Sequence, residues 1–231
     1  MNTRNHHGII LALLAGSSQA ITYPTVMPLG DSNTAGYQPA WANPYGGGYR
    51  ETLENALPPA VDFVGPRSDW ASATIRDPDH NGNLGWTIAP YGGRNGLQTN
   101  IAGWLNTYNP GIVLLQIGTN DLDLGKPVPD ALADLHLLIV TINTTRPSAK
   151  VYVATLPPLA NATKNLNVMS FNSQLGTALI GTTAKPGPDV YAAVNGRLID
   201  SWHPTEAALK DVGRSWAQRI AKDFPRVGVQ Q

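Results

Sequence analysis

The sequence of 231 residues contains no cysteine and few charged residues. The absence of cysteine excludes disulfide bonds, thiolate-ligated metal sites and thiol nucleophiles. Only 14% of the residues are charged, against roughly 25% in an ordinary soluble domain. Basic and acidic residues number 16 each, so no basic surface for nucleic acid or an anionic membrane is indicated. We therefore expect a neutral globular protein that depends on its hydrophobic core and has no nucleic-acid or membrane partner.

The sequence also lacks an apolar run long enough to cross a bilayer. A short apolar run over 9–15 follows Arg4 and precedes Ser18-Gln19-Ala20. A basic start, a compact apolar stretch and a small-residue end are typical of a secretory signal. We predict a signal peptide over 1–20, a single domain over 21–231 and a secreted, extracellular protein. The alternative is that the apolar run forms a buried N-terminal strand or helix.

Two Asn-X-Thr triplets fit the secretory route. They begin at Asn143 and Asn161 and are the candidate glycosylation sites. Such triplets also arise by chance, so they give this route only weak support.

Short apolar runs alternate with helical patterns along the chain. We expect strands over 26–29, 61–64, 112–117, 151–154 and 190–194. We expect helices over 49–57, 97–105, 129–142, 168–180 and 204–220. This alternation predicts a flavodoxin-like α/β fold, in which a five-stranded parallel sheet lies between two helical layers as a three-layer α/β/α sandwich. The strand order would be 2-1-3-4-5, with the ligand crevice at the carboxyl ends of strands 1 and 3.

Chemically useful side chains follow these strands at the predicted edge. Strand 1 leads into Gly30-Asp31-Ser32, strand 3 into Gly118-Thr119-Asn120-Asp121, and the last strand is followed by Asp200-Ser201-Trp202-His203-Pro204. Each segment taken alone could be an ordinary turn or a helix entry. Pro204 suits a first helical position, which would put His203 near a cap where Ser, Thr, Asp or Asn serves better.

A serine hydroxyl is a weak nucleophile and needs a base within hydrogen-bond reach. Among the histidines beyond the predicted signal peptide, His203 has a carboxylate, Asp200, three residues upstream, whereas His136 falls inside a predicted helix. The sequence therefore predicts Ser32 as nucleophile, His203 as base and Asp200 as the residue that orients the base. An oxyanion hole requires N–H donors, which Asn120 and Gly85 can supply.

Together these segments resemble the four sequence blocks of the SGNH (GDSL-type) hydrolases, in order and over residues 30–204. The resemblance implies a serine esterase that needs no metal or organic cofactor. It also implies that the N–H of Ser32 joins Gly85 and Asn120 in the oxyanion hole. Gly82 is an alternative to Gly85 for this role. Asp200 is the least secure member of the triad, because some of these enzymes manage with Ser and His.

Residues 77–88 are similar to the second block of the acetylxylan esterases of carbohydrate esterase family three, and Asp62-Phe63-Val64-Gly65 leads into it in the same way. Asn81 and Asn83 stand where that group has Glu and His, so polar contacts to the substrate are expected to differ. The resemblance implies acetyl esters on a plant-wall polysaccharide as substrate. We expect a monomer, although no sequence feature bears on the oligomeric state. Alternatives are a lipase, a thioesterase or a pectin-type acetylesterase on the same scaffold, or a non-catalytic carbohydrate-binding protein.

Four further residues are candidate substrate contacts: Trp86, Tyr91, Trp202 and His80. The aromatic rings could form a platform for a sugar, and ordinary packing is the alternative for each. Asp31 is expected to hold the turn through backbone hydrogen bonds rather than to take part in the chemistry.

Overall fold

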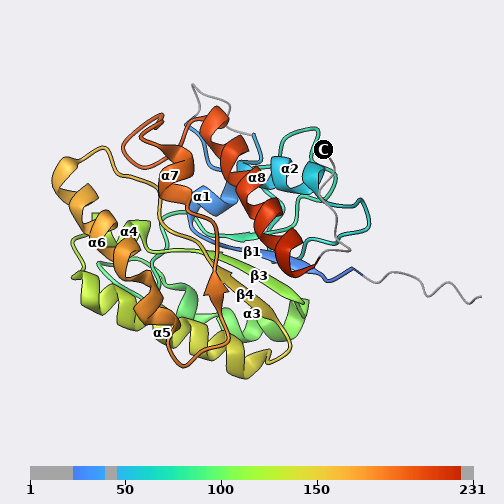
Figure 1. Ribbon diagram of the computed structural model, residues 1–231, viewed down its shortest axis with the longest axis horizontal. Coiled ribbons are helices and arrows are strands. Elements are labelled where there is room, and N and C mark those ends of the chain that lie inside the picture. The colour runs from blue at the N-terminus through green and yellow to red at the C-terminus, as the bar shows by residue number, and fades with distance from the viewer. Residues whose placement is uncertain (1–22, 40–45, 225–231) are drawn as a thin grey trace, which may run out of the picture.

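A computed structural model describes residues 23–39 and 46–224 (Figure 1). The predicted signal peptide lies outside the described residues. The fold is α/β, as the sequence predicts, with a five-stranded, all-parallel sheet in the order β2-β1-β3-β4-β5. The strands are β1 (Val26–Gly30), β2 (Asn81–Gly82), β3 (Ile112–Gln116), β4 (Lys150–Val153) and β5 (Lys185–Pro186).

Helices cover both faces of the sheet. They are α1 (Ser32–Ala35), α2 (Tyr49–Ala56), α3 (Ile101–Tyr108), α4 (Thr119–Asp123), α5 (Val128–Thr145), α6 (Ala162–Leu179), α7 (Val190–Val194) and α8 (Glu206–Asp223), with a 3₁₀ turn, Leu97–Thr99, before α3. Helices α2, α7 and α8 lie on one face and α3, α5 and α6 on the other (Figure 1). No helix among the described residues is long and apolar enough to cross a membrane.

The two cores follow from the alternation of side chains along the central strands. In β3, Val113 and Leu115 pack with α3, α5 and α6, whereas Ile112 and Leu114 pack with α2, α7 and α8. Successive side chains of a strand point to opposite faces, and a parallel sheet with helices on both faces is apolar on both. The nearly continuous apolar run of β3 is the sequence signature of this arrangement.

The predicted fifth strand is wrong. Val190–Val194 is helix α7, capped by Asp189, whose Oδ1 accepts the N–H of Ala192 at 3.0 Å. The two valines, four residues apart, are both buried in the core under α8, which is the spacing of one helix face. The β-branched residues favoured a strand, but the cap and this spacing prevail. The fifth strand is instead the exposed pair Lys185–Pro186, which carries no apolar signal.

The predicted second strand is only half of the observed edge. Residues 61–64 meet β1 at one bridge between Phe63 and Val26, where the N–H of Val64 donates to the carbonyl of Val26 at 2.9 Å. The chain then leaves the sheet and returns at Asn81–Gly82 to pair with the end of β1. The edge strand is therefore divided into two parts. Its second part, Asn81–Gly82, lies beside the end of β1 and the residues that follow it.

Three predicted helices begin elsewhere. Helix α3 starts at Ile101 rather than at residue 97, after a 3₁₀ turn, and the other two start after a capping side chain. Helix α8 starts after Thr205, whose Oγ1 accepts the N–H of Ala208 at 3.3 Å, so Pro204 and His203 lie outside the helix. Helix α6 starts at Ala162 rather than at residue 168, because Asn161 caps it and accepts the N–H of Lys164 at 3.0 Å. In both cases a side-chain oxygen satisfies an N–H that the first turn leaves without an intrahelical partner.

Candidate active site

The turn after β1 carries Ser32 at the start of α1. Asp31 caps this short helix, and its Oδ1 accepts the N–H of Asn33 at 2.9 Å, as the sequence predicts. Burial raises the pKa of Asp31 to about 6, although the Asn33 N–H opposes the rise. A Cβ on Gly30 would lie 2.1 Å from the carbonyl oxygen of Gln116, so only glycine lets the turn pack against the end of β3.

His203 joins Ser32 to Asp200. Its Nε2 lies 3.0 Å from Oγ of Ser32, and its Nδ1 lies 2.7 Å from Oδ2 of Asp200. The other carboxylate oxygen, Oδ1, accepts the backbone N–H groups of Trp202 and His203, both at 2.7 Å. Because the carboxylate can only accept, Nδ1 carries the hydrogen and Nε2 is free to accept the serine proton.

The Asp200 carboxylate is held in its ionised form. Partial burial alone would raise the pKa of Asp200, but the hydrogen bonds from His203 and from the N–H of Trp202 outweigh it and lower the pKa below the usual value. A charged carboxylate at this position stabilises the imidazolium that forms when His203 takes a proton. The geometry therefore provides a nucleophile, a base and an orienting group in one chain of contacts.

Two candidate oxyanion donors come from separate elements. Asn120 lies on α4, and its Nδ2 donates one hydrogen to the carbonyl of Trp86 at 2.8 Å, which leaves the second amide hydrogen for a ligand. Gly85 lies on the long loop with φ of +73°, a left-handed conformation that favours glycine. Ser32, Gly85, Asn120 and His203 all line one cleft of about 400 Å³.

Gly82 is not placed for the oxyanion role. Its N–H donates to Nδ1 of His80 at 2.9 Å. A Cβ on Gly82 would lie 2.3 Å from the backbone nitrogen of Ala35, so this glycine allows β2 to approach α1 closely. Between the two glycines that the sequence offers, the geometry favours Gly85.

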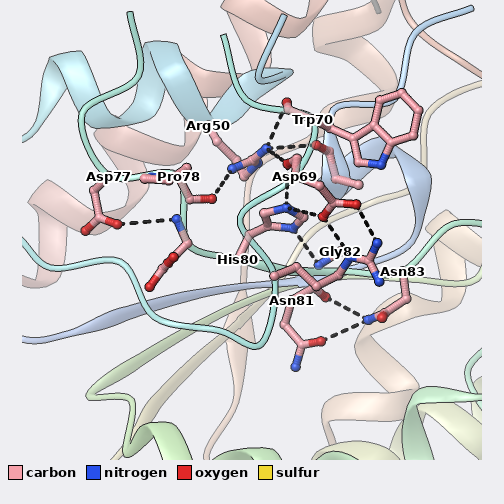
Figure 2. A network of polar contacts seen from close by, with 12 residues as sticks. Arg50, Asp69, Trp70, Asp77, Pro78, His80, Asn81, Gly82 and Asn83 are labelled. Carbon is pink, nitrogen blue, oxygen red and sulfur yellow. Dashed lines mark hydrogen bonds and ion pairs between the residues drawn. The ribbon is translucent and has the colours of Figure 1, made fainter. Parts of the chain in front are cut away.

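His80 is a structural residue rather than a substrate contact, so its assignment from sequence is wrong. Its side chain is completely buried and does not line the cleft. Since Nδ1 accepts the N–H of Gly82, Nε2 carries the hydrogen and donates to the carbonyl of Asp69 at 2.9 Å (Figure 2). Burial, aided by the nearby charge of Arg50, lowers the pKa of His80 to about 3, so the ring is neutral.

Arg50 completes this network. Its guanidinium donates to the carbonyls of Pro78 at 2.8 Å, Ala35 at 2.9 Å and Trp70 at 3.2 Å (Figure 2). The side chain is only 2% exposed and links the end of α1 to two points of the loop between α2 and β2. Asn81 and Asn83 lie below it, buried and joined by a hydrogen bond of 2.9 Å. Their polar groups therefore bind each other and are not in the cleft lining.

The predicted aromatic contacts separate into one residue in the cleft and two outside it. Trp202, 39% exposed, lines the cleft. Trp86 instead packs on Trp104, with ring centroids 5.8 Å apart, and it is the backbone carbonyl of Trp86 that accepts the hydrogen bond from Asn120. Tyr91 lies under the ammonium group of Lys126, 4.9 Å from the ring centroid. Trp86 and Tyr91 are thus packing residues, the alternative noted from the sequence.

Five lining residues were not predicted as site residues from the sequence: Tyr37, Leu84, Arg94, Thr119 and Asp123. The ring of Tyr37 lies 4.9 Å from that of His203, and Asp123 accepts a hydrogen bond from Lys164 at 2.8 Å. Tyr37 follows the nucleophile by five residues, a spacing that could have suggested proximity. Arg94 sits in a Tyr-Gly-Gly-Arg turn, a signal for a tight turn but not for a site.

Asp121 connects the helix and the loop that carry the candidate oxyanion donors. Its Oδ2 accepts the N–H of Ile88 at 3.0 Å, and its Oδ1 lies 3.4 Å from Nζ of Lys126, which also pairs with Asp134. Burial raises the pKa of Asp121 to about 6, although the Ile88 N–H and Lys126 oppose the rise. This carboxyl ties α4, which carries Asn120, to the loop that carries Gly85.

A Ser-His-Asp chain of contacts beside two candidate N–H donors, at the carboxyl edge of a doubly covered parallel sheet, is the arrangement that serine hydrolases use. The chain belongs to the GDSL-like Lipase/Acylhydrolase family, whose profile matches residues 29–224. By class it is a carboxylic ester hydrolase of the SGNH type.

Solved structures with this fold include two carbohydrate esterases of family 3. The Clostridium thermocellum protein is 29% identical, with a TM-score of 0.66 over 88% of this chain and 98% of its own. The Talaromyces cellulolyticus protein is 22% identical, with a TM-score of 0.71 over 89% of this chain and 100% of its own. The second likeness concerns the fold alone.

A curated relative, the multidomain esterase of Ruminococcus flavefaciens, is 30% identical over 222 residues, which cover 84% of this chain. The match spans 28% of that relative's length. The similarity therefore concerns only the portion of the longer esterase that aligns with this chain.

Proposed function

We propose that this protein removes acetyl groups from plant cell-wall polysaccharide, as an acetylxylan esterase does. The observation that carries the proposal is the contact chain from Ser32 through His203 to Asp200 within a cleft that also holds Gly85 and Asn120. The likeness to family 3 carbohydrate esterases supports an acetylated sugar as substrate. Arg94 and Asp123 on the cleft wall suit a hydroxyl-rich substrate better than a long acyl chain.

In the proposed mechanism, Oγ of Ser32 attacks the acetyl carbonyl carbon while Nε2 of His203 takes the hydroxyl proton. The oxyanion forms against the N–H groups of Ser32 and Gly85 and the amide of Asn120. The C–O bond to the sugar then breaks, and the sugar oxygen takes the proton from His203. Water, activated by His203, attacks the acetyl-enzyme in the same way and releases acetate.

The reaction requires no metal or organic cofactor in this scheme, since the developing charge meets N–H donors of the chain itself. Ser32, its base and its oxyanion donors all come from the carboxyl edge of one sheet, so the proposed catalytic unit is a monomer. Within the described residues, no group of three or more His, Asp or Glu side chains is placed to hold a metal ion.

The proposal places the enzyme outside the cell, on the basis of the signal sequence predicted over 1–20. Of the two glycosylation candidates, Asn161 is exposed at the start of α6. Asn143 has its Oδ1 bonded to the N–H of Thr183 at 3.1 Å and its Nδ2 buried. A glycan attaches to that amide nitrogen, so Asn161 is the accessible site.

The test combines acetate release with labelling of the nucleophile. Wild-type protein should release acetate from acetylated xylo-oligosaccharides, prefer p-nitrophenyl acetate to p-nitrophenyl octanoate, and react with a serine-directed phosphonate. Ser32→Ala should abolish all three while keeping the circular dichroism spectrum. Faster hydrolysis of the octanoate would indicate a lipase. Absence of labelling together with binding of the oligosaccharide would indicate a non-catalytic carbohydrate-binding protein.

A further inference from the structure

One cationic side chain on the cleft wall is not neutralised by a neighbour. Arg94 lines the cleft, and among the described residues its guanidinium has no ion pair and no hydrogen-bond acceptor. The charges nearby are already paired: Asp123 with Lys164 at 2.8 Å, and Lys126 with Asp121 at 3.4 Å. The wall of the cleft therefore carries a positive charge at Arg94 that is available to a ligand.

The position of Arg94 is defined by a tight turn. Tyr91 and Arg94 exchange backbone hydrogen bonds of 3.3 and 2.9 Å, and the two residues between them, Gly92 and Gly93, have φ of +55° and +78°. Two successive positive φ values give the turn that closes a two-residue hairpin, and glycine adopts them without strain. The ring of Tyr91 under Lys126 holds one side of this turn.

The base of the turn is fixed to the rest of the loop. Thr87 donates its N–H to the carbonyl of Asn95 at 2.9 Å and accepts the N–H of Leu97 at 3.0 Å. A Cβ on Gly96 would lie 2.3 Å from the carbonyl carbon of Ala89, so the two arms of the loop are in close backbone contact. Arg94 therefore projects from an ordered support.

The guanidinium lies directly against the candidate oxyanion loop. A Cβ built on Gly85 would be 2.9 Å from Nη1 of Arg94, so the absence of a side chain at Gly85 creates the space that Arg94 occupies. An anionic group next to the ester under attack would meet this guanidinium. Arg binds a carboxylate through two parallel N–H···O bonds, a geometry that its planar fork matches.

We propose that Arg94 forms a carboxylate subsite, which binds a uronic acid unit next to the acetylated sugar. The inference rests on the proposed function and narrows it to acidic acetylated polysaccharides. A uronic acid carries a carboxylate, which gives a sugar chain a negative charge. The unpaired guanidinium of Arg94 in the cleft wall is the positive group that can bind it. Arg94 in this role is a specificity-determining residue that contacts substrate away from the reacting atoms.

The test compares two acetylated xylo-oligosaccharides of matched length, one neutral and one bearing a glucuronic acid substituent. Wild-type enzyme should show the higher kcat/KM on the acidic substrate, through a lower KM, and added salt should reduce the preference. Arg94→Gln should reduce the acidic-to-neutral ratio of kcat/KM about tenfold, the lower end of the effect of losing a hydrogen bond to a charged group. Arg94→Lys should restore part of it, because the charge returns without the fork.

Arg214→Gln is the matched control, since Arg214 is an exposed arginine on α8, paired with Asp211 at 2.6 Å, and its loss should leave the ratio unchanged. An unchanged acidic-to-neutral ratio in Arg94→Gln would overturn the subsite. If both kcat/KM values fell equally, Arg94 would act on the reaction itself, and if neither fell, Arg94 would not contact the substrate. Failure of wild-type enzyme to release acetate from either oligosaccharide, with p-nitrophenyl acetate still hydrolysed, would instead refute the proposed function and the subsite with it.

Discussion

The backbone N–H of Gly82 donates to Nδ1 of His80 at 2.9 Å, in a network completed by Arg50 (Figure 2). The bond commits the amide of Gly82 to a buried ring and leaves Gly85 as the loop glycine that lines the cleft. The two glycines stand three residues apart in the same block of sequence. They differ because the N–H of Gly82 is already bonded to His80, whereas Gly85 lines the cleft.

This difference predicts that the same substitution lowers stability alone at Gly82, whereas at Gly85 it also lowers turnover. Gly82→Ala would drive a Cβ to 2.3 Å from the backbone nitrogen of Ala35, and overpacking of this kind costs about 1–3 kcal/mol. We expect a fall in Tm of several degrees, since about 1 kcal/mol shifts a domain of this size by about 2–4 °C. Calorimetry measures this change, and an unaltered Tm would contradict the close packing of β2 on α1.

Gly85→Ala should act mainly on turnover. The new Cβ would meet the movable end of Arg94 at 2.9 Å and strain a φ of +73°, at a cost of about 1–2 kcal/mol. Gly125→Ala is the matched control, because Gly125 has φ of +82° and an added Cβ there would meet nothing within 4 Å. Both variants should lose similar stability, and only Gly85→Ala should lose kcat on p-nitrophenyl acetate. Equal kcat values would remove Gly85 from the oxyanion hole.

Asn120→Ala should reduce kcat by about 10²–10³, the effect of removing one oxyanion donor. KM should change little, because the donor stabilises charge that develops only in the transition state. Asn106→Ala, at an exposed position of α3, serves as control for the loss of an amide. Near-normal turnover of the Asn120 variant in a steady-state assay would refute the role that we assign.

Asp200→Asn tests the least secure member of the triad. An amide at this position can donate to Nδ1 and so favour the wrong tautomer of His203, which in a serine protease triad costs on the order of 10⁴ in turnover. We expect a loss of about 10²–10⁴ in kcat with the fold intact, and no loss in Asp130→Asn, an exposed residue in the first turn of α5. A loss below about tenfold would show that Ser32 and His203 suffice.

Asp31→Asn should stabilise the protein at neutral pH. Burial raises the pKa of Asp31 from 3.8 to about 6, so between these values the folded state holds a proton that the unfolded state has released. Stability from this group is therefore complete below about pH 4 and is lost as the pH rises to about 6, by at most about 3 kcal/mol. Asparagine retains Oδ1 as the acceptor for Asn33 and has no charge to bury.

The measurement is urea unfolding of wild type and Asp31→Asn at about pH 3 and about pH 8, below and above both pKa values. The gain of the variant should appear at the higher pH and vanish at the lower. A gain of equal size at both values would trace the effect to packing instead of ionisation. Asp130→Asn again serves as the control, with no gain expected at either pH.

The sequence was most informative where a local pattern decides the outcome. An almost continuous apolar run such as β3 needs cover on both faces of the sheet. The alternation of such runs with helices predicts a parallel sheet between two helical layers. Ser32 and Asn120 were predicted together because the carboxyl ends of parallel strands meet at one edge. His203 was predicted from Asp200, three residues upstream, since the strand expected before it is helix α7. The same local reasoning failed at Val190–Val194, where a capping Asp189 outweighs the β-branched side chains.

The fold class, and the candidate triad with it, were thus predictable from the order of short local motifs, because strand, turn and cap chemistry act over a few residues. The choice of Gly85 over Gly82, the burial of His80 and the entry of Arg94 into the cleft were decided only by tertiary structure. Each depends on a partner far along the chain or on a backbone group, such as the carbonyls held by Arg50. A hydrogen bond to a backbone group can be made at any residue, and so it leaves no pattern in the sequence.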